Sequence, residues 1–445
     1  MSAFAAFILF VIYLNVPAVA VREYGIPFVA GAAIPLLLLI PMFERIVLQS
    51  QPLRFPALII AAAVLLCIQA TGAFLAIYPE ESLRVVIEWG LEGVLLTLLI
   101  VNIFRTRADA IAAVNAVIAA GAIMGAIVLL QQALGATDHN LMGFGQLDSP
   151  MVDDEGQTQR RLAGPIGETN RFAQVMAVLI PVSAAMAVVR GGLLRYAYII
   201  ATLLISGGMA LAFSRGVIVA MILAVPFALF FRILKLRHIA IGLAAGITLL
   251  AMLPHYAERV WSIGEVAVQT LGVSPGGTRN ADGAARGRLT EMKATVLVFA
   301  DHPLLGAGMG MAQMHYPEYA PVVGGNVRAG TRQSHNLYLQ LAAETGIIGL
   351  AVFTAIIVFA FAGLEHARKR LEGRDPTLWG MVCGMELGLI IYLGTSLFLH
   401  SAYIRYFWLL LGLCVVVSTA ERAPVLLRLL ARMLAQTAQR VRAGQ

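Results

Sequence analysis

The stretch RQSHNLYLQLAAETGIIGLAVFTAIIVFAFAGL, residues 332–364, joins a polar segment directly to an apolar run. From residue 341 to residue 364 the run is long enough to cross the roughly 30 Å hydrocarbon core of a membrane as a helix. Its polar start carries arginine, histidine and asparagine where the helix would leave the bilayer. The stretch therefore predicts a membrane helix with a polar site at one end.

The composition of the whole chain is that of a polytopic membrane protein. Hydrophobic residues make up 59% of the 445 residues, charged residues 13%, and the mean hydropathy is +0.82. A water-soluble domain carries about 25% charged residues. We predict an all-α fold, because open sheet edges are not tolerated in lipid. About twelve spans are expected, at residues 3–21, 25–43, 56–78, 85–104, 109–133, 172–189, 196–213, 216–234, 238–253, 341–364, 378–400 and 403–420.

The distribution of Lys and Arg predicts the orientation of these spans. An even number of spans places both termini on one side, and cytoplasmic loops hold the excess of basic residues. With the termini in the cytoplasm, the short inner loops carry thirteen basic residues, and the short outer loops carry only Arg22, Arg84, Arg215 and Arg405. The two long loops, 134–171 and 254–340, then face outward. We expect one membrane domain, residues 1–445, with a large outer loop between the ninth and tenth spans.

The basic tail, residues 421–445, has apolar residues at helical spacing with five arginines among them. This pattern is typical of a helix on an anionic inner leaflet, and equally of a solvated basic end. Cys67, Cys383 and Cys414 all fall inside expected spans, so no disulfide is expected in the outer loops. The net charge of +7 forms no compact basic patch with interleaved aromatics, which argues against a nucleic-acid partner.

The large outer loop is rich in arginine and leads into the quoted stretch. Arginines on a loop beside a membrane indicate an anionic, membrane-attached ligand such as a lipid phosphate, because the guanidinium group binds phosphate oxygens in pairs. The loop arginines that support this interpretation are Arg259, Arg279, Arg286, Arg288, Arg328 and Arg332.

Several motifs occur in a fixed order around this loop. RGRLTEMKATVLVFADHPLLGAGMG spans residues 286–310, and SHNLYLQLAAETGIIG spans residues 334–349. Together they resemble the O-antigen ligase and polymerase superfamily of lipid-linked-donor glycosyltransferases. Ser214-Arg215-Gly216 and RLAGPIGETNRFAQ, residues 161–174, resemble two further markers of that family. Met292 stands where the family usually has an aromatic residue, which removes an expected packing contact but no charge.

The resemblance implies a metal-independent, inverting transferase at the periplasmic face of the bacterial inner membrane, with no cofactor. Its expected partners are an undecaprenyl-pyrophosphate-linked glycan donor, a glycan or lipid A core acceptor, and membrane lipids. An O-antigen or polysaccharide polymerase and an O-antigen ligase fit equally. A protein O-oligosaccharyltransferase and a transporter or flippase remain alternatives. A transporter would show broken helices at corresponding places in two halves, and a flippase would need polar groups through the depth of the bilayer.

Three residues are predicted to carry the chemistry. Arg215 and Arg288 suit the stabilisation of a departing pyrophosphate, because arginine stays charged and binds phosphate in a planar fork. His335 suits the removal of a proton from the acceptor hydroxyl, and a nearby arginine would keep it neutral. The expected substrate-binding residues are Arg161, Asn170, Arg171, Arg286, Arg332, Asn336, Tyr338 and Arg405.

Each of these residue types also has a structural interpretation. Arg215 would suit a helix end at the membrane interface, and His335 would suit the start of a helix capped by Ser334 or Asn336. His302 and Pro303 predict a turn that ends a helix after Asp301. Glu88, Glu92 and Glu386, within spans, are open between structural ion pairs and a role in the site. In the first outer loop, a divalent-cation site and, as the more frequent case, solvated loop charge are the two interpretations of Asp148, Asp153, Asp154 and Glu155.

Overall fold

The computed structural model describes residues 1–27, 34–136, 139–147, 151–152, 158–159, 161–230, 279–325, 327–400 and 402–420. In this part of the chain the long elements are helices, and the strands are two or three residues long. The elements are α1 (Ser2–Tyr13), α2 (Val16–Tyr24), α4 (Leu39–Phe43), η1 (Glu44–Leu48), α5 (Ala57–Phe74), α6 (Pro79–Trp89), η2 (Gly90–Leu95), α7 (Leu96–Ile103), α8 (Arg107–Ala133), η3 (Leu141–Gly143), β1 (Gln146–Leu147), β2 (Met151–Val152), β3 (Thr158–Gln159), β4 (Leu162–Gly164), α9 (Thr169–Val189), α10 (Gly192–Leu211), α11 (Arg215–Phe230), α14 (Arg279–Asp301), α15 (Tyr316–Val323), α16 (Leu337–Leu371), α17 (Pro376–Thr395) and α18 (Arg405–Thr419).

The helices confirm a multi-pass membrane protein. Among the described residues, seven helices are long and apolar enough to cross a membrane, and the bent pair α1 and α2 would make an eighth. α11 and α18 are shorter apolar helices. The ninth expected span, residues 238–253, and the tail lie outside the described residues, so the number twelve stays a prediction.

Several expected spans differ in detail from the helices. The expected span 3–21 is bent between α1 and α2, and within the expected span 25–43 the described helix α4 covers only Leu39–Phe43. The expected span 85–104 begins earlier, at Pro79, and passes through the π-helical turn η2 before α7. The expected span 341–364 is part of the longer helix α16. Its polar start already belongs to the helix, because Asn336 caps the first turn and makes the helix begin at Leu337.

Glycines allow the central helices to approach closely. A Cβ atom added at Gly384 of α17 would lie 2.6 Å from the Cα of Val182 on α9, and one at Gly388 would lie 2.8 Å from a backbone oxygen of the same helix. Small residues of this kind let membrane helices gain van der Waals contact along their backbones. Near the start of α9 and the end of α17, the Gln174 amide donates to the Thr395 hydroxyl at 2.6 Å. α9 and α17 therefore form a fixed support beneath the polar loops.

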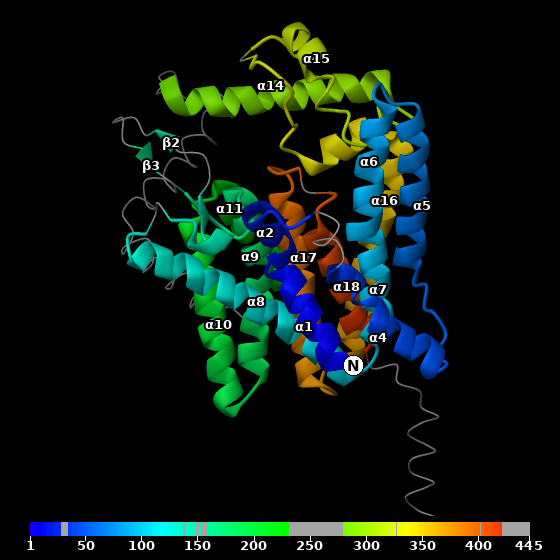
Figure 1. Ribbon diagram of the computed structural model, residues 1–445, viewed down its shortest axis with the longest axis vertical. Coiled ribbons are helices and arrows are strands. Elements are labelled where there is room, and N and C mark those ends of the chain that lie inside the picture. Colours follow the sequence, from blue (N-terminus) through cyan, green and yellow to red (C-terminus); the bar gives the residue numbers. More distant parts are fainter. Residues whose placement is uncertain are drawn as a thin grey trace, which may run out of the picture.

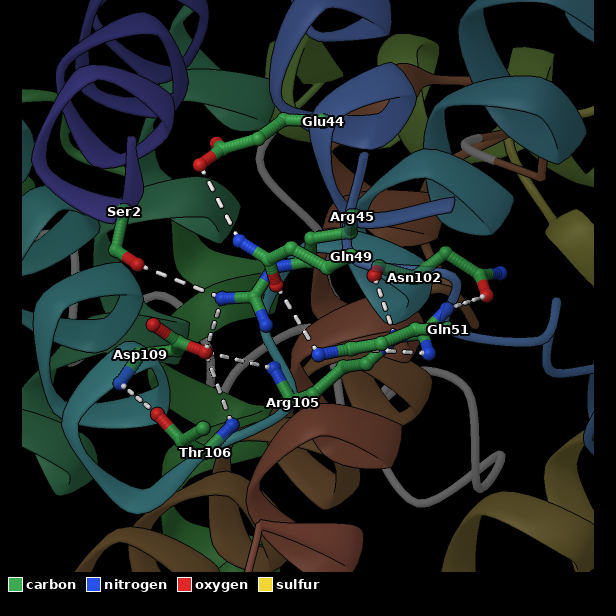
Figure 2. A network of polar contacts seen from close by, with 9 residues as sticks. All are labelled: Ser2, Glu44, Arg45, Gln49, Gln51, Asn102, Arg105, Thr106 and Asp109. Carbon is green, nitrogen blue, oxygen red and sulfur yellow. Dashed lines mark hydrogen bonds and ion pairs between the residues drawn. The ribbon is translucent and has the colours of Figure 1, made fainter. Parts of the chain in front are cut away.

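The end of the bundle that carries the N-terminus is held by a polar network (Figure 2). Asp109 accepts from Arg45 at 2.6 Å and forms a capping box with Thr106 at the start of α8. Arg105 donates to the Asn102 side chain at 2.7 Å. These arginines belong to the expected inner loops, and they lie at the opposite end of the bundle from α14 (Figure 1).

Helix α16 is broken at Gly346, where the outer loop is attached to it. Gly346 has φ 64° and ψ −171°, which interrupts the helical hydrogen bonds. The backbone N–H of Ile347 donates instead to Pro303 O at 2.8 Å, and the N–H of Ala307 donates to Ala343 O at 2.8 Å. The HPLLGAG turn thus satisfies backbone groups that the break exposes, as buried backbone groups require.

Replacing Gly346 by alanine is expected to destabilise the protein, because this backbone conformation is open almost only to glycine and costs other residues about 1–3 kcal/mol. The added Cβ would also lie 2.1 Å from Leu304 O. The thermal midpoint in detergent should fall. Gly363→Ala on the same helix is the control, since its Cβ would meet only Ser418 at 3.5 Å. Equal midpoints for the two variants would contradict the role assigned to the break.

Candidate functional site

Helix α14 carries Arg288 at the end of the bundle opposite the N-terminus. It lies across that end, with α15 packed beside it (Figure 1). As predicted, it ends at Asp301, directly before the turn that contains His302 and Pro303. Arg288 is exposed on this helix, whereas Glu291, one turn further on, is only 1% exposed. The two residues therefore place a cation and a buried carboxylate side by side.

Arg328 returns from the following loop to the same part of α14. Its guanidinium lies over Gly287, where an added Cβ would be 2.5 Å from the Arg328 side chain. Its Nη1 lies 3.7 Å from Glu291 Oε1, and its backbone N–H donates to the Tyr316 hydroxyl on α15 at 3.1 Å. The packing on Gly287 thus brings a second arginine to Glu291.

His335 lies in a strained turn directly before α16. Its φ is +46°, a left-handed conformation that is uncommon for a residue other than glycine. The turn is held on both sides, because the Asn336 side chain accepts from Leu339 N at 3.0 Å and donates to Leu397 O at 3.1 Å. The backbone N–H of Leu337 also donates to Ser396 O at 2.9 Å. His335 is therefore fixed at the junction of α16 with the α17–α18 connection.

The environment of His335 favours the neutral imidazole. Burial, followed by the charges of Arg288, Arg328 and Arg332, lowers its pKa to about 4. Its Nε2 lies 3.9 Å from Glu291 Oε2, and the His400 ring lies edge-on at a centroid distance of 5.2 Å. The sequence indicates the arginine effect, but burial is the larger cause. A neutral ring with a free lone pair is the form that a general base requires.

Arg215 begins α11 and faces the same cluster of charges. It is exposed and interacts electrostatically with Arg288. The turn before it is held by Arg161, which donates to Ala212 O at 2.7 Å, and by Ser214, whose hydroxyl donates to Asn170 Oδ1 at 3.0 Å. Arg161 also donates to Asn170 Oδ1, at 3.3 Å. Arg161 and Asn170 therefore position Arg215 from beneath, in addition to any contact with substrate.

The remaining predicted binding residues fall into two groups. Arg332 is exposed and acts electrostatically on His335, and Arg171 pairs with Glu168 at 3.6 Å and acts on His400. Others are occupied by contacts within the protein: the Tyr338 hydroxyl donates to Leu393 O at 2.8 Å, and Arg405 pairs with Glu92 at 3.3 Å. The side chain of Arg286 lies outside the described part of the structure.

The acidic residues of the spans form ion pairs. Glu88 pairs with Arg84 at 3.2 Å on the surface, and Glu386 lies 3.5 Å from Arg368. With the Glu92 pair, this geometry favours the structural interpretation. Asp148, Asp153, Asp154 and Glu155 lie outside the described residues.

Glu291 is the residue that sequence analysis missed. One signal for it was present, since it follows Arg288 by three residues and so shares a face of any helix there. The sequence does not show that this face is buried against the strained turn of His335. Arg328 was recognised as a loop arginine, but its position beside Glu291 depends on the fit against Gly287.

The low pKa of His335 predicts the pH dependence of the reaction. If neutral His335 is the base, activity is retained above its pKa and is lost as pH falls through it. The acidic limb of kcat/KM, which reports the free enzyme, should therefore lie near pH 4 rather than near 6.5. An anionic ligand bound to the arginines would offset their charges, so the limb of kcat should lie at higher pH. Coincident limbs near 6.5 would contradict this assignment.

Comparison with known proteins agrees with the motifs. A protein-family model described as O-Antigen ligase matches residues 200–354. This segment contains Arg215, Arg288, Glu291 and His335, and ends in α16 just beyond its break. No curated protein sequence matches the chain. Residues 200–354 are therefore similar to the O-antigen ligase family, in agreement with the resemblance that the motifs indicate.

Proposed function

We propose that the chain is a metal-independent, inverting glycosyltransferase at the outer face of the bacterial inner membrane, with both termini in the cytoplasm. It moves a glycan from undecaprenyl pyrophosphate to an acceptor hydroxyl. The observation that carries the proposal is the meeting of exposed Arg215 and Arg288 with a neutral His335 at one end of a membrane bundle.

The arginines match the leaving group of this reaction. Breaking the bond between the sugar C1 and the pyrophosphate oxygen leaves its electron pair, and so negative charge, on the diphosphate. Donors that are in place before the reaction stabilise such charge without reorganisation. Arg215 and Arg288 come from two different elements, α11 and α14, and their positive charges repel each other. A diphosphate bound between them would remove this repulsion.

The histidine matches the other half of the reaction. The acceptor oxygen forms a bond to C1 while its proton passes to the neutral imidazole of His335, which becomes imidazolium and later releases the proton to water. Attack from the face opposite the diphosphate inverts the anomeric carbon. In this scheme the fixed turn at residue 335 supplies the orientation that makes proton transfer efficient.

The identity of the acceptor separates a polymerase from a ligase. A polymerase extends another lipid-linked glycan, whereas a ligase transfers the glycan to lipid A core. We propose one of these two acceptors, because the match is to the O-antigen ligase family. Transfer to a protein would instead identify the chain as a protein O-oligosaccharyltransferase.

A turnover assay tests the proposal. Purified protein in nanodiscs would receive an undecaprenyl-pyrophosphate-linked glycan with, in separate arms, more donor, lipid A core or an unfolded acceptor protein. We expect release of undecaprenyl pyrophosphate, transfer in one of the first two arms, and no loss of activity with EDTA. Movement of the intact donor across the membrane without transfer would favour a transporter and contradict the proposal.

A further inference from the structure

Glu291 is a buried carboxylate that the mechanism above does not use. Its side chain is 1% exposed, and neither carboxylate oxygen has a hydrogen-bond partner among the described residues. A buried carboxylate without such partners is costly unless a nearby charge or donor compensates for it. Among the described residues, two basic groups lie within ion-pair distance: Arg328 Nη1 at 3.7 Å and His335 Nε2 at 3.9 Å.

We propose that Glu291 is the positioning residue for His335: its Oε2 accepts a hydrogen bond from Nε2–H, which leaves Nδ1 as the nitrogen that takes the acceptor proton. The inference rests on the proposed function. The present distance of 3.9 Å exceeds a hydrogen bond, but contacts of this kind often shorten only when substrate is bound. A carboxylate partner fixes the tautomer and the ring orientation of a catalytic histidine.

The surroundings of the pair determine how its charges respond. Arg288 lies on the same helix as Glu291, Arg328 and Arg332 come from the following loop, and His400 from the α17–α18 connection. Burial raises the pKa of Glu291, and the three arginines oppose that rise. When a diphosphate binds to the arginines, its negative charge weakens the electrostatic attraction between the arginines and the Glu291 carboxylate. The carboxylate is then free to stabilise the imidazolium that forms at His335 during transfer.

The test compares Glu291→Gln and Glu291→Asp with wild type in the nanodisc transfer assay. Glutamine keeps the size of the side chain but removes its charge. We expect a fall in kcat of about tenfold or more, little change in the KM for the donor, and an acidic limb of kcat at lower pH, because the imidazolium has lost its counter-charge. Aspartate should restore part of kcat.

The same loop supplies a matched control. His315 Nδ1 and Glu318 Oε2 lie 3.5 Å apart, but Glu318 is 70% exposed and belongs to α15. Glu318→Gln should therefore leave kcat and its pH profile unchanged. Thermal midpoints measured for all variants identify any loss that comes from unfolding.

Three outcomes would overturn the inference. A wild-type kcat and pH profile in Glu291→Gln would show that His335 needs no carboxylate partner. A lower donor KM with unchanged kcat would show that Glu291 is only a counter-ion to the arginines. A lower kcat with an unmoved pH limb would assign Glu291 a packing role. If His335→Ala also keeps full activity, the proposed function fails as well, which separates the two failures.

Discussion

Replacement of His335 by alanine is expected to lower the rate of glycan transfer by about 10²–10⁴-fold, the usual contribution of a general base. The loss should appear in kcat, because the imidazole acts on the acceptor proton during transfer and contributes little to donor binding. Single-turnover measurement of undecaprenyl pyrophosphate release, at saturating donor and acceptor, would show it directly.

His302 provides the comparison for this variant. It lies on the same loop, and its ring is 5.6 Å from that of His315 in a second histidine pair outside the arginine cluster. His302→Ala should keep most of the activity of the wild type. If both variants lose activity at unchanged stability, or if neither does, His335 is not the base.

Replacement of Arg288 by alanine should cost about 10²–10³-fold in transfer, as the loss of a preorganised donor to a developing anion does elsewhere. Arg288→Lys should recover only part of the rate, because a lysine ammonium cannot bind two diphosphate oxygens in a planar fork. The pKa of His335 should also rise in Arg288→Ala, since one repelling charge is removed. The acidic limb of kcat/KM would then move to higher pH.

Lys293 is a suitable control for charge alone. It is exposed on the same helix, five residues beyond Arg288. Lys293→Ala should reduce the transfer rate less than twofold. Raising the ionic strength should not lower the rate of Lys293→Ala to that of Arg288→Ala. If the two alanine variants behave alike, the arginine acts through the general field of the loop and not through contact with the leaving group.

The sequence could predict the helical membrane fold and the resemblance to the O-antigen ligase family, but not the internal geometry of the candidate site. Apolar runs of membrane length define α5, α8, α9 and α17 almost alone, because the bilayer fixes the length of a span. Ordered motifs placed Arg215, Arg288 and His335 in one site. Their meeting depends on contacts far apart in the chain, such as the hydrogen bond from Leu337 N to Ser396 O.

Some residues predicted to bind substrate instead make contacts within the protein, because the sequence does not show the partners of a side chain. The sequence does not distinguish Arg161 and Arg405 from Arg288 as phosphate-binding candidates. In the structure, however, Arg161 supports the end of α10 and Arg405 pairs with Glu92. Only burial and partners distinguish an arginine held by the protein from one left for a ligand. The carboxylate of Glu291 was missed because the sequence shows its helical face but not what that face contacts.

The attachment of the outer loop to α16 has a consequence for protein engineering. The connections at Ala307, Gly308 and Ile347 are made between main-chain atoms, so exchanges of side chain elsewhere in the loop do not remove them. A chimaera that keeps residues 302–310 and 334–349, together with Arg328 and Arg332, would therefore retain its anchorage and the charges around His335 while the rest of the intervening sequence is exchanged. The segment can thus be varied without rebuilding the transmembrane scaffold.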